Sequence, residues 1–411
     1  MSLFTPELQG YYYTFASVLA LQMFLELGLG PIITYFAAHE WAKLSFDKKG
    51  YITGDSRALS RLISLGHSSL RWYLMGGGII AFGISSGGYF FFLQSPDVGI
   101  NWVVPWFSLS VLTGVIFVMT PVWAILEGCN QVSQVYSFRM VNTVLGTIAT
   151  WSSIYLGAAL WTASISSGVF ILSSAFFLLW RYYNFIKSFI SRPSGPRVSW
   201  SQEIWKIQWR AAITAVGNYF SFYFFTPVLF HFHGPAIGGQ FGLSMSIVLT
   251  IASVSAMWSK PRGPQFAVMI ANKEYKALDS LLYRIIKVSV VILFFGTLTV
   301  WLFVYGLNII NHPFSSRIIA PLPLALFLIG VLLGNASYPT SVYLRAHKCE
   351  PYAMLTIVNA VVTGSLSLVL GIKYAVIGVA VAYLMTTSLI LLPWQLAIFL
   401  RNRREFLSRM V

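Results

Sequence analysis

VVPWFSLSVLTGVIFVMTPVWA, at residues 103–124, is the stretch that decides the fold, because its 22 residues include no charged side chain. A bilayer core is roughly 30 Å thick, and about 20 apolar residues in a helix cross it. Ten further stretches have the same character, of which 166–181 is short unless it extends into 163–165. The predicted spans are 12–37, 70–93, 103–124, 141–162, 166–181, 211–230, 238–258, 285–308, 318–338, 353–370 and 375–400.

The composition of the chain excludes a soluble protein. Hydrophobic residues make up 57% of the chain and charged residues only 9%, whereas about a quarter of a soluble domain is charged. The net charge of +15 would suit a nucleic-acid partner, but the basic residues lie between apolar spans and form no single basic face. We therefore predict an all-α polytopic membrane protein whose partner is the lipid bilayer, with no nucleic acid.

The distribution of Lys and Arg predicts the orientation in the membrane. Of the 27 basic residues, 25 fall in alternate gaps between spans, and only Arg317 and Lys373 fall in the other gaps. Basic residues stay on the cytoplasmic side of a membrane. The N-terminus of this chain is therefore predicted to lie outside and the C-terminus in the cytoplasm. The basic gaps are 41–71, the position Arg139, 181–210, 260–287, 345–348 and 401–409.

A weak internal repeat predicts that the chain consists of two similar bundles. GDSRALSRLI at 54–63 resembles KEYKALDSLL at 273–282, with an offset of 219 residues, and two further echoes have offsets of 218 and 217. Both segments have the pattern of amphipathic helices that lie along the membrane surface. We predict a helical lobe over 1–184 with five spans, a basic cytoplasmic linker over 185–210 and a lobe over 211–411 with six spans.

The repeat also predicts a helix upstream of this sequence. Subtracting 218 from the sixth span, 211–230, gives −7 to 12, so the first half lacks a counterpart of that span. A twelfth span would precede Met1, and the two halves would insert with the same orientation.

Glu26 is the most informative intramembrane residue, because it is the only one of twelve acidic residues that lies deep within a span. Gln22 precedes it by one turn and Gly30 follows by one turn, so a continuous helix would place the three on one face. Intramembrane ionisable residues tend to mark a substrate or ion pathway. The alternative is a protonated or hydrogen-bonded glutamate that only joins helices.

Other polar side chains have two interpretations each. One group could extend a polar cavity or form hydrogen bonds between helices: Asn218, Ser221, Tyr223, Gln240 and Asn335. A second group could attract an anionic head group at the cytoplasmic mouth or anchor the spans in the interface: Arg71, Arg139, Arg210, Lys260 and Arg262.

The sequence contains no recognisable catalytic or cofactor motif. His231 and His233 form a pair without a third ligand, so no metal site is predicted. Cys129 and Cys349 both fall in gaps assigned to the cytoplasm, where thiols stay reduced. No nucleotide-binding loop, nucleophile elbow or HExxH motif is present. The outer gaps reach only nine residues, which argues against a membrane glycan polymerase or ligase, and we predict a transporter without a cofactor.

Several segments resemble the lipid-linked oligosaccharide flippases (Wzx-type O-antigen translocases) of the multidrug/oligosaccharidyl-lipid/polysaccharide exporter superfamily. LFTPELQGY at 3–11 is similar to the family's loop between helices one and two, and FLELGL at 24–29 follows it. LEGCN at 126–130 resembles the segment before helix five. GQFGLS at 239–244 resembles part of helix eight, and KPRGPQ at 260–265 resembles the loop after that helix.

This resemblance implies two six-helix lobes around a central cavity that opens alternately to either side of the membrane. The implied substrate is an undecaprenyl-diphosphate-linked oligosaccharide, which would move from the cytoplasmic to the outer leaflet of the bacterial inner membrane. Such a flippase serves O-antigen or other surface polysaccharide biosynthesis, and a polysaccharide polymerase is an implied partner. The family pattern has twelve spans and this chain has eleven. The alternative is a multidrug or cation antiporter of the same superfamily, in which Glu26 would bind the cation.

Overall fold

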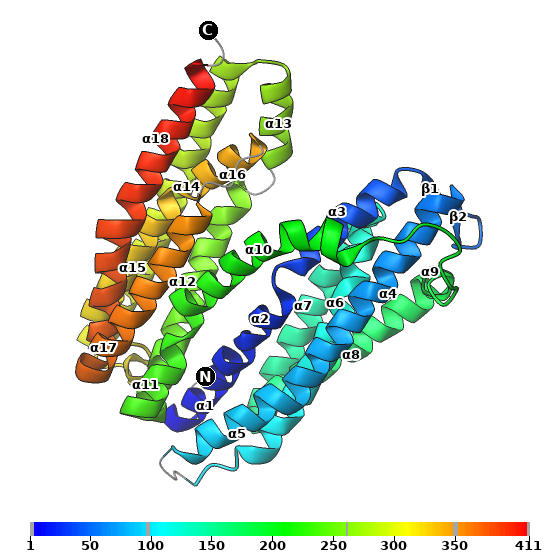
Figure 1. Ribbon diagram of the computed structural model, residues 1–411. Coiled ribbons are helices and arrows are strands. Elements are labelled where there is room, and N and C mark those ends of the chain that lie inside the picture. Colours follow the sequence, from blue (N-terminus) through cyan, green and yellow to red (C-terminus); the bar gives the residue numbers. More distant parts are fainter. Residues whose placement is uncertain (1–3, 96–98, 260–261, 348–351, 409–411) are drawn as a thin grey trace. The chain divides into compact units, whose positions relative to one another are not determined.

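The computed structural model describes residues 4–95, 99–259, 262–347 and 352–408, and nearly all of them are helical (Figure 1). The chain forms two compact units. Unit 1 comprises the residues up to Leu8 and Phe15–Val216, and unit 2 comprises Gln9–Thr14 and Gly217–Val411. The prediction of an all-α polytopic membrane protein is confirmed. The three-part division into lobes and linker stays a prediction.

Unit 1 is built around α6, which packs against α3, α4 and α8, while α7 packs chiefly against α8. Trp106 of α6 is fully buried among Phe15 and Phe92, with ring centroids about 5 Å apart. The elements of this unit are α1 (Pro6–Leu19), η1 (Ala20–Gln22), α2 (Met23–Glu26), α3 (Leu29–Trp41), β1 (Leu44–Phe46), β2 (Ile52–Gly54), α4 (Ser56–Gly78), η2 (Ile79–Ile84), α5 (Ser85–Leu93), α6 (Val103–Gly128), α7 (Val132–Tyr155), α8 (Trp161–Arg181), α9 (Tyr183–Ser188), η3 (Trp200–Ile204) and α10 (Trp205–Asn218), the last of which continues into unit 2.

Unit 2 has a core in which α12, α14, α15 and α17 surround Phe241, Phe327 and Tyr383. Its elements are η4 (Tyr219–Tyr223), α11 (Phe225–His233), α12 (Pro235–Ser259), α13 (Gly263–Ala271), α14 (Tyr275–Ile309), η6 (Pro313–Arg317), α15 (Pro321–Ala336), α16 (Tyr338–Ala346), α17 (Ala353–Thr386), η7 (Thr387–Leu391) and α18 (Leu392–Ser408). The chain reverses inside α17, where Tyr374 and Ala375 leave the helical conformation.

Each predicted span overlaps helix in the structure. Among the described residues, eight helices are long and apolar enough to cross a membrane, and the bent pair formed by Pro6–Glu26 and Leu29–Trp41 would make a ninth. The last of the eight, Met354–Phe406, contains the reversal at Tyr374 and therefore two of the predicted spans. The fifth span does extend beyond its predicted start, because α8 begins at Trp161.

The fourth predicted span is displaced in the structure. We predicted 141–162, whereas α7 runs over Val132–Tyr155 and is not among the helices apolar enough to qualify as a span. The predicted start lies too late in the chain because the first turns of α7 carry polar side chains, and a search for apolar stretches leaves these out. They are Ser133, Gln134, Ser137 and Arg139. The helix instead gains its stability from tertiary packing against α8.

Two other expectations about helix ends are wrong. The segment Leu3–Tyr11 was expected to be a loop, but α1 begins at Pro6, because Thr5 caps the helix by accepting a hydrogen bond from the Leu8 amide (3.2 Å). The two repeated segments were expected to lie along the membrane surface. They are instead the first turns of α4 and α14, and both helices continue into spans.

The buried faces of α4 and α14 correspond to each other at an offset one residue longer than the 219 of the sequence repeat. Leu62, Ser69 and Tyr73 of α4 are almost fully buried, and so are Leu282, Ser289 and Leu293 of α14. These three pairs share an offset of 220 residues (282 − 62, 289 − 69, 293 − 73). The two long helices therefore bury equivalent positions, each within its own unit.

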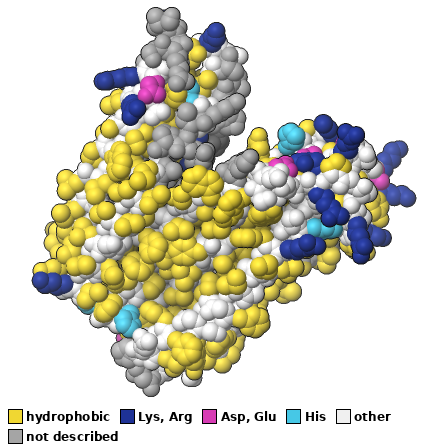
Figure 2. Space-filling view, in the orientation of Figure 1, with side chains coloured by type: hydrophobic (Ala, Val, Ile, Leu, Met, Phe, Trp, Pro, Cys, Tyr) yellow, Lys and Arg dark blue, Asp and Glu magenta, His cyan; other side chains and the backbone are white. Residues whose placement is uncertain are grey.

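The flanks of the helices and their ends carry different types of side chain (Figure 2). Apolar side chains cover the helix flanks, as expected for surfaces in contact with lipid. In unit 1, basic side chains gather at the end that carries the β1–β2 hairpin and α9. The exposed ones in these segments include Lys43, Lys48, Lys49 and Lys187.

Candidate substrate and ion pathway

Glu26 lies at a break in the first membrane-spanning helix. The backbone of Leu27 (φ 50°) and of Gly28 (φ 67°) is left-handed, which ends α2 and allows α3 to begin at Leu29. The two halves of the span are bent by 42°. Only glycine adopts this conformation without strain, so Gly28 permits the break. Our expectation that Gln22, Glu26 and Gly30 share one face of a continuous helix is therefore wrong.

The break brings the Glu26 carboxylate to the N-terminus of α3. A Cβ atom placed on Gly30 would lie 3.2 Å from Glu26 Oε1, so the carboxylate rests beside the first turn of that helix. The backbone N–H groups of a first turn have no partner within the helix, and the helix dipole is positive there. A helix N-terminus favours a carboxylate placed beside it, so this position suits an acidic side chain that has no basic partner. Discontinuous helices with such termini form ion and substrate sites in secondary transporters.

The break also exposes backbone that α4 and α10 cover. The Trp72 indole of α4 donates a hydrogen bond to the Leu25 carbonyl (2.8 Å), and its ring stacks on Trp200 with centroids 5.9 Å apart. On the other side, a Cβ atom on Gly28 would lie 2.7 Å from the Ala211 Cβ of α10. Only a glycine allows this close approach.

Polar side chains with open hydrogen-bonding capacity lie around the break. The Tyr73 hydroxyl and the Ser69 hydroxyl, one turn apart on α4, are buried and have no hydrogen-bond partner among the described residues. The helix that carries Glu26, α2, packs against α4. The amide of Gln208, one turn before Ala211, is also buried without a partner in the described part of the chain.

Sequence reasoning missed three of these residues. Ser69 and Tyr73 fall at the edge of a predicted span, and Gln208 precedes the sixth span by three residues. These residues could have been found by looking for polar side chains on the helices that pack beside a glycine where a span is broken. Gln22, which we predicted, lies in η1 and is half-buried.

The predicted pathway residues of unit 2 do not converge. Among them, Asn218 is exposed and Tyr223 stacks on Tyr219. Gln240 donates to the Ser316 carbonyl (2.9 Å), which ties α12 to η6, and Asn335 donates to the Val331 carbonyl of its own helix (3.1 Å). Ser221 likewise donates to the Gly217 carbonyl one turn earlier (2.9 Å).

The predicted head-group residues differ in how much of their charge is free. Arg139 forms an ion pair with Glu127 (2.5 Å), and Arg262 donates to the Gln265 side chain (3.0 Å). Arg71 is exposed on α4. Lys260 lies outside the described residues, and of Arg210 only the backbone is described.

The structure also shows the surroundings of His233 and Cys129, which the sequence singled out. The His233 imidazole lies 2.7 Å from the Gly371 carbonyl, and no cluster of three metal-binding side chains occurs within the described ranges. Cys129 is fully buried at the end of α6, where burial raises the pKa of its thiol. Cys349 lies outside the described residues.

Comparison with known proteins identifies the fold. No protein-family model and no curated protein sequence matches the chain. Solved structures do match it over almost its whole length. An outward-facing multidrug resistance MATE family transporter of the MOP superfamily has a TM-score of 0.56, with 14% identity, 97% of this chain covered and 88% of that chain.

Two further structures agree with this match. A MATE structure in the straight conformation has a TM-score of 0.55, with 14% identity and coverage of 98% and 90%. A MOP superfamily transporter from Pyrococcus furiosus, described as having a binding pocket of reverse polarity that suggests a different function, has a TM-score of 0.54, with 14% identity and coverage of 98% and 89%. The chain therefore has the fold of the MATE transporters of the MOP superfamily.

Proposed function

We propose that this chain is a secondary transporter that exchanges an amphiphilic cationic compound for a proton or a sodium ion. The observation that carries the proposal is the intramembrane carboxylate of Glu26 at a helix break, beside the N-terminus of α3. Similarity of fold to multidrug MATE transporters supports the same reading. Fold alone does not determine a substrate, so the site has to carry the argument.

The site suits antiport because one carboxylate serves two cations in turn. When Glu26 is ionised, it attracts a cationic substrate into surroundings of low polarity, where the electrostatic attraction is stronger than in water. A proton or sodium ion that binds the same carboxylate removes that attraction and releases the substrate. The hydroxyls of Tyr73 and Ser69 and the amide of Gln208 offer open hydrogen-bonding groups near the break.

A flippase for lipid-linked oligosaccharides is the second candidate, in the bacterial inner membrane. The observation that favours it is that two segments resembling that family meet in unit 2. Gln9 donates hydrogen bonds to the Gly239 carbonyl and to the Arg317 carbonyl (2.9 Å each), and a Cβ atom on Gly239 would lie 2.6 Å from the Gly10 amide nitrogen. A diphosphate, however, requires free positive charge, and Arg139 is already paired with Glu127.

Transport by purified protein in liposomes tests both candidates. We expect Glu26→Gln to lower ethidium uptake driven by a pH or sodium gradient by about tenfold or more, the scale of a typical coupling free energy. Glu26→Asp keeps the charge and should retain part of the activity. Glu405→Gln is the matched control, because Glu405 forms an exposed pair with Arg401 on α18 and such pairs contribute little.

The outcomes separate the two substrates. If Glu26→Gln leaves ethidium uptake unchanged, Glu26 does not bind the exchanged cations as proposed. A wild-type protein that moves no cationic dye, but does translocate a fluorescent polyprenyl-diphosphate glycan to the opposite leaflet, replaces the antiporter with the flippase.

A further inference from the structure

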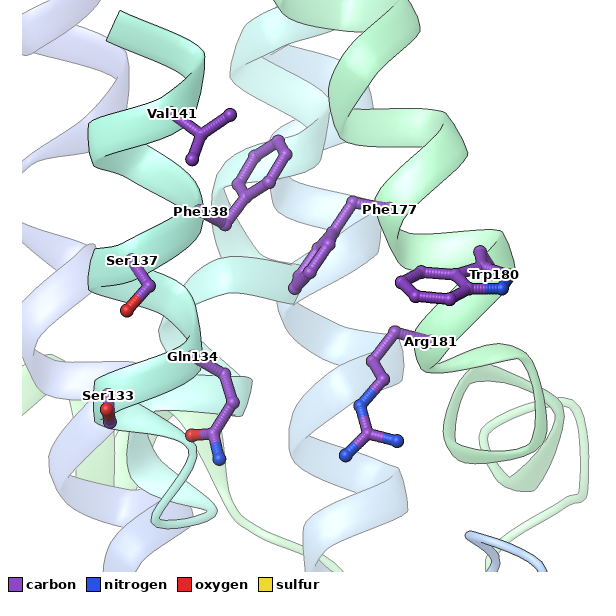
Figure 3. A pocket seen from close by; sticks show the side chains of 8 residues that line it. All are labelled: Ser133, Gln134, Ser137, Phe138, Val141, Phe177, Trp180 and Arg181. Carbon is purple, nitrogen blue, oxygen red and sulfur yellow. The ribbon is translucent and has the colours of Figure 1, made fainter.

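A groove on unit 1, outside the Glu26 site, has the features of a ligand site. It lies between the first turns of α7 and the last turns of α8 and has a volume of about 630 Å³, which is in the range of small-molecule sites (Figure 3). Because α7 begins and α8 ends at this side of the unit, the groove sits at one membrane boundary. The basic residues nearby predict that this boundary faces the cytoplasm.

The lining changes from polar to apolar along the groove. Ser133, Gln134 and Ser137 line it near the start of α7, and Phe138 and Phe177 line it further along the helices. The rings of Phe138 and Phe177 stack with centroids 4.4 Å apart. A ligand that matches this gradient has a polar head at the membrane boundary and an apolar body directed into the hydrocarbon.

Arg181 supplies the charge of the groove. Its guanidinium and the Gln134 amide extend into the same end of the groove from opposite helices, as Figure 3 shows. Arg181 forms no ion pair with any described carboxylate, whereas Arg139 is neutralised by Glu127. A planar guanidinium binds phosphate through two parallel hydrogen bonds, and the amide and hydroxyls add donors for the remaining oxygens.

The walls of the groove are fixed in place by side-chain hydrogen bonds just beyond it. The Asn142 amide of α7 donates to the Ser174 hydroxyl of α8 (3.3 Å), and the Ser173 hydroxyl donates to the Asn142 side-chain oxygen (3.0 Å). These bonds hold the two helices at a constant separation. The groove therefore does not have to be assembled when a ligand arrives, which lowers the entropic cost of binding.

We propose that this groove binds an anionic phospholipid of the cytoplasmic leaflet, with its phosphodiester on Arg181 and Gln134 and an acyl chain along Phe138 and Phe177. Basic pockets between membrane helices on the cytoplasmic side are suited to such head groups. One guanidinium matches the single negative charge of a phosphodiester better than the larger charge of a diphosphate. Trp180, a residue that is 74% exposed at the rim, suits the interfacial layer of the membrane.

Native mass spectrometry of the purified protein with phosphatidylglycerol and phosphatidylcholine tests the site. We expect wild-type protein to retain phosphatidylglycerol preferentially and Arg181→Gln to lower that preference about fivefold, the effect of one basic residue near an anionic lipid. Arg181→Lys, which keeps the charge but loses the planar fork, should fall between the two. Arg192→Gln, an exposed arginine beyond α9, is the matched control and should change nothing.

Four results would overturn the proposal. The first is equal retention of the two lipids by wild-type protein. The second is unchanged phosphatidylglycerol binding in an Arg181→Gln protein that melts at the wild-type temperature. The third is displacement of the lipid by inorganic phosphate at equal concentration, since free phosphate lacks the acyl chain that the aromatic wall requires. Tighter binding of a polyprenyl diphosphate than of phosphatidylglycerol would also reject a phospholipid as the occupant.

Discussion

Arg61 shows how a single charged residue can hold together segments far apart in the sequence. Its guanidinium donates to Glu40 at the end of α3 (2.7 Å) and to Glu203 in η3 (2.7 Å). Nearby, the Ser60 and Ser64 hydroxyls of α4 accept hydrogen bonds from the amides of residues 195 and 198. The linker after α9 is thus attached to unit 1, which the sequence alone could not show, because acidic partners 21 and 142 residues away have no local pattern.

We expect the two carboxylates that bind Arg61 to contribute unequally to stability. Glu40 is buried, with its side chain 7% exposed, so Glu40→Gln removes a charged partner of Arg61 from surroundings of low polarity and should cost about 2–3 kcal/mol. The Glu203 side chain is 32% exposed, and Glu203→Gln should cost about 1 kcal/mol or less because solvent screens that pair. Thermal unfolding in detergent measures the difference. Equal losses in the two variants would contradict this ranking.

The hydrogen bond from Arg61, helped by that from the Ser199 amide, lowers the pKa of Glu203 below its ordinary value. An acid with a lowered folded-state pKa stabilises the protein above its unfolded pKa, about 4.3, and loses that contribution as the pH falls through the folded pKa. The stability difference between wild type and Glu203→Gln should therefore be constant between about pH 7 and pH 5.5 and shrink progressively as the pH falls below about 4.3 and through the lowered folded-state pKa. A difference that persists in strong acid would exclude an ionic contribution.

At the scale of elements, apolar length predicted the helices well and predicted their irregularities poorly. Most of the predicted spans coincide with apolar helices, because about 20 apolar residues have few other structural outcomes, whereas α7 is displaced and less apolar. The break at Leu27–Gly28 was missed, since glycine is common in membrane helices and does not by itself mark a break. The Arg181 groove was missed because a basic residue at the end of a span is indistinguishable from a topology anchor.

Two glycine substitutions should have opposite effects and so test the break. Gly28→Ala would place a Cβ atom 2.7 Å from that of Ala211 in a left-handed backbone, and we expect a loss of about 1–2 kcal/mol or more. Gly78→Ala, at the end of α4, would meet nothing within 4 Å, and we expect a gain of about 0.5–1 kcal/mol. Thermal unfolding of both variants is the measurement. A stabilised Gly28→Ala protein would mean that the first span is continuous.

At the scale of the whole molecule, the alternation of basic and non-basic gaps predicts which side of the membrane each gap faces, and that orientation has still to be tested. The helices establish that the chain crosses a membrane many times, and the fold is that of MATE transporters. Which ends of the helices face the cytoplasm follows only from the positive-inside rule. The leaflet of the lipid groove and the side from which Glu26 is reached depend on the same assignment.

Cysteine labelling decides the orientation. In a background of Cys129→Ser and Cys349→Ser, Asn101→Cys reports on a gap predicted to lie outside, and Ser194→Cys reports on the basic segment after α9. Both positions are exposed, so each thiol can react with a charged maleimide that does not cross the membrane. We expect position 101 to react in intact cells and position 194 only after permeabilisation. The reverse pattern would invert the topology and place the Arg181 groove in the outer leaflet.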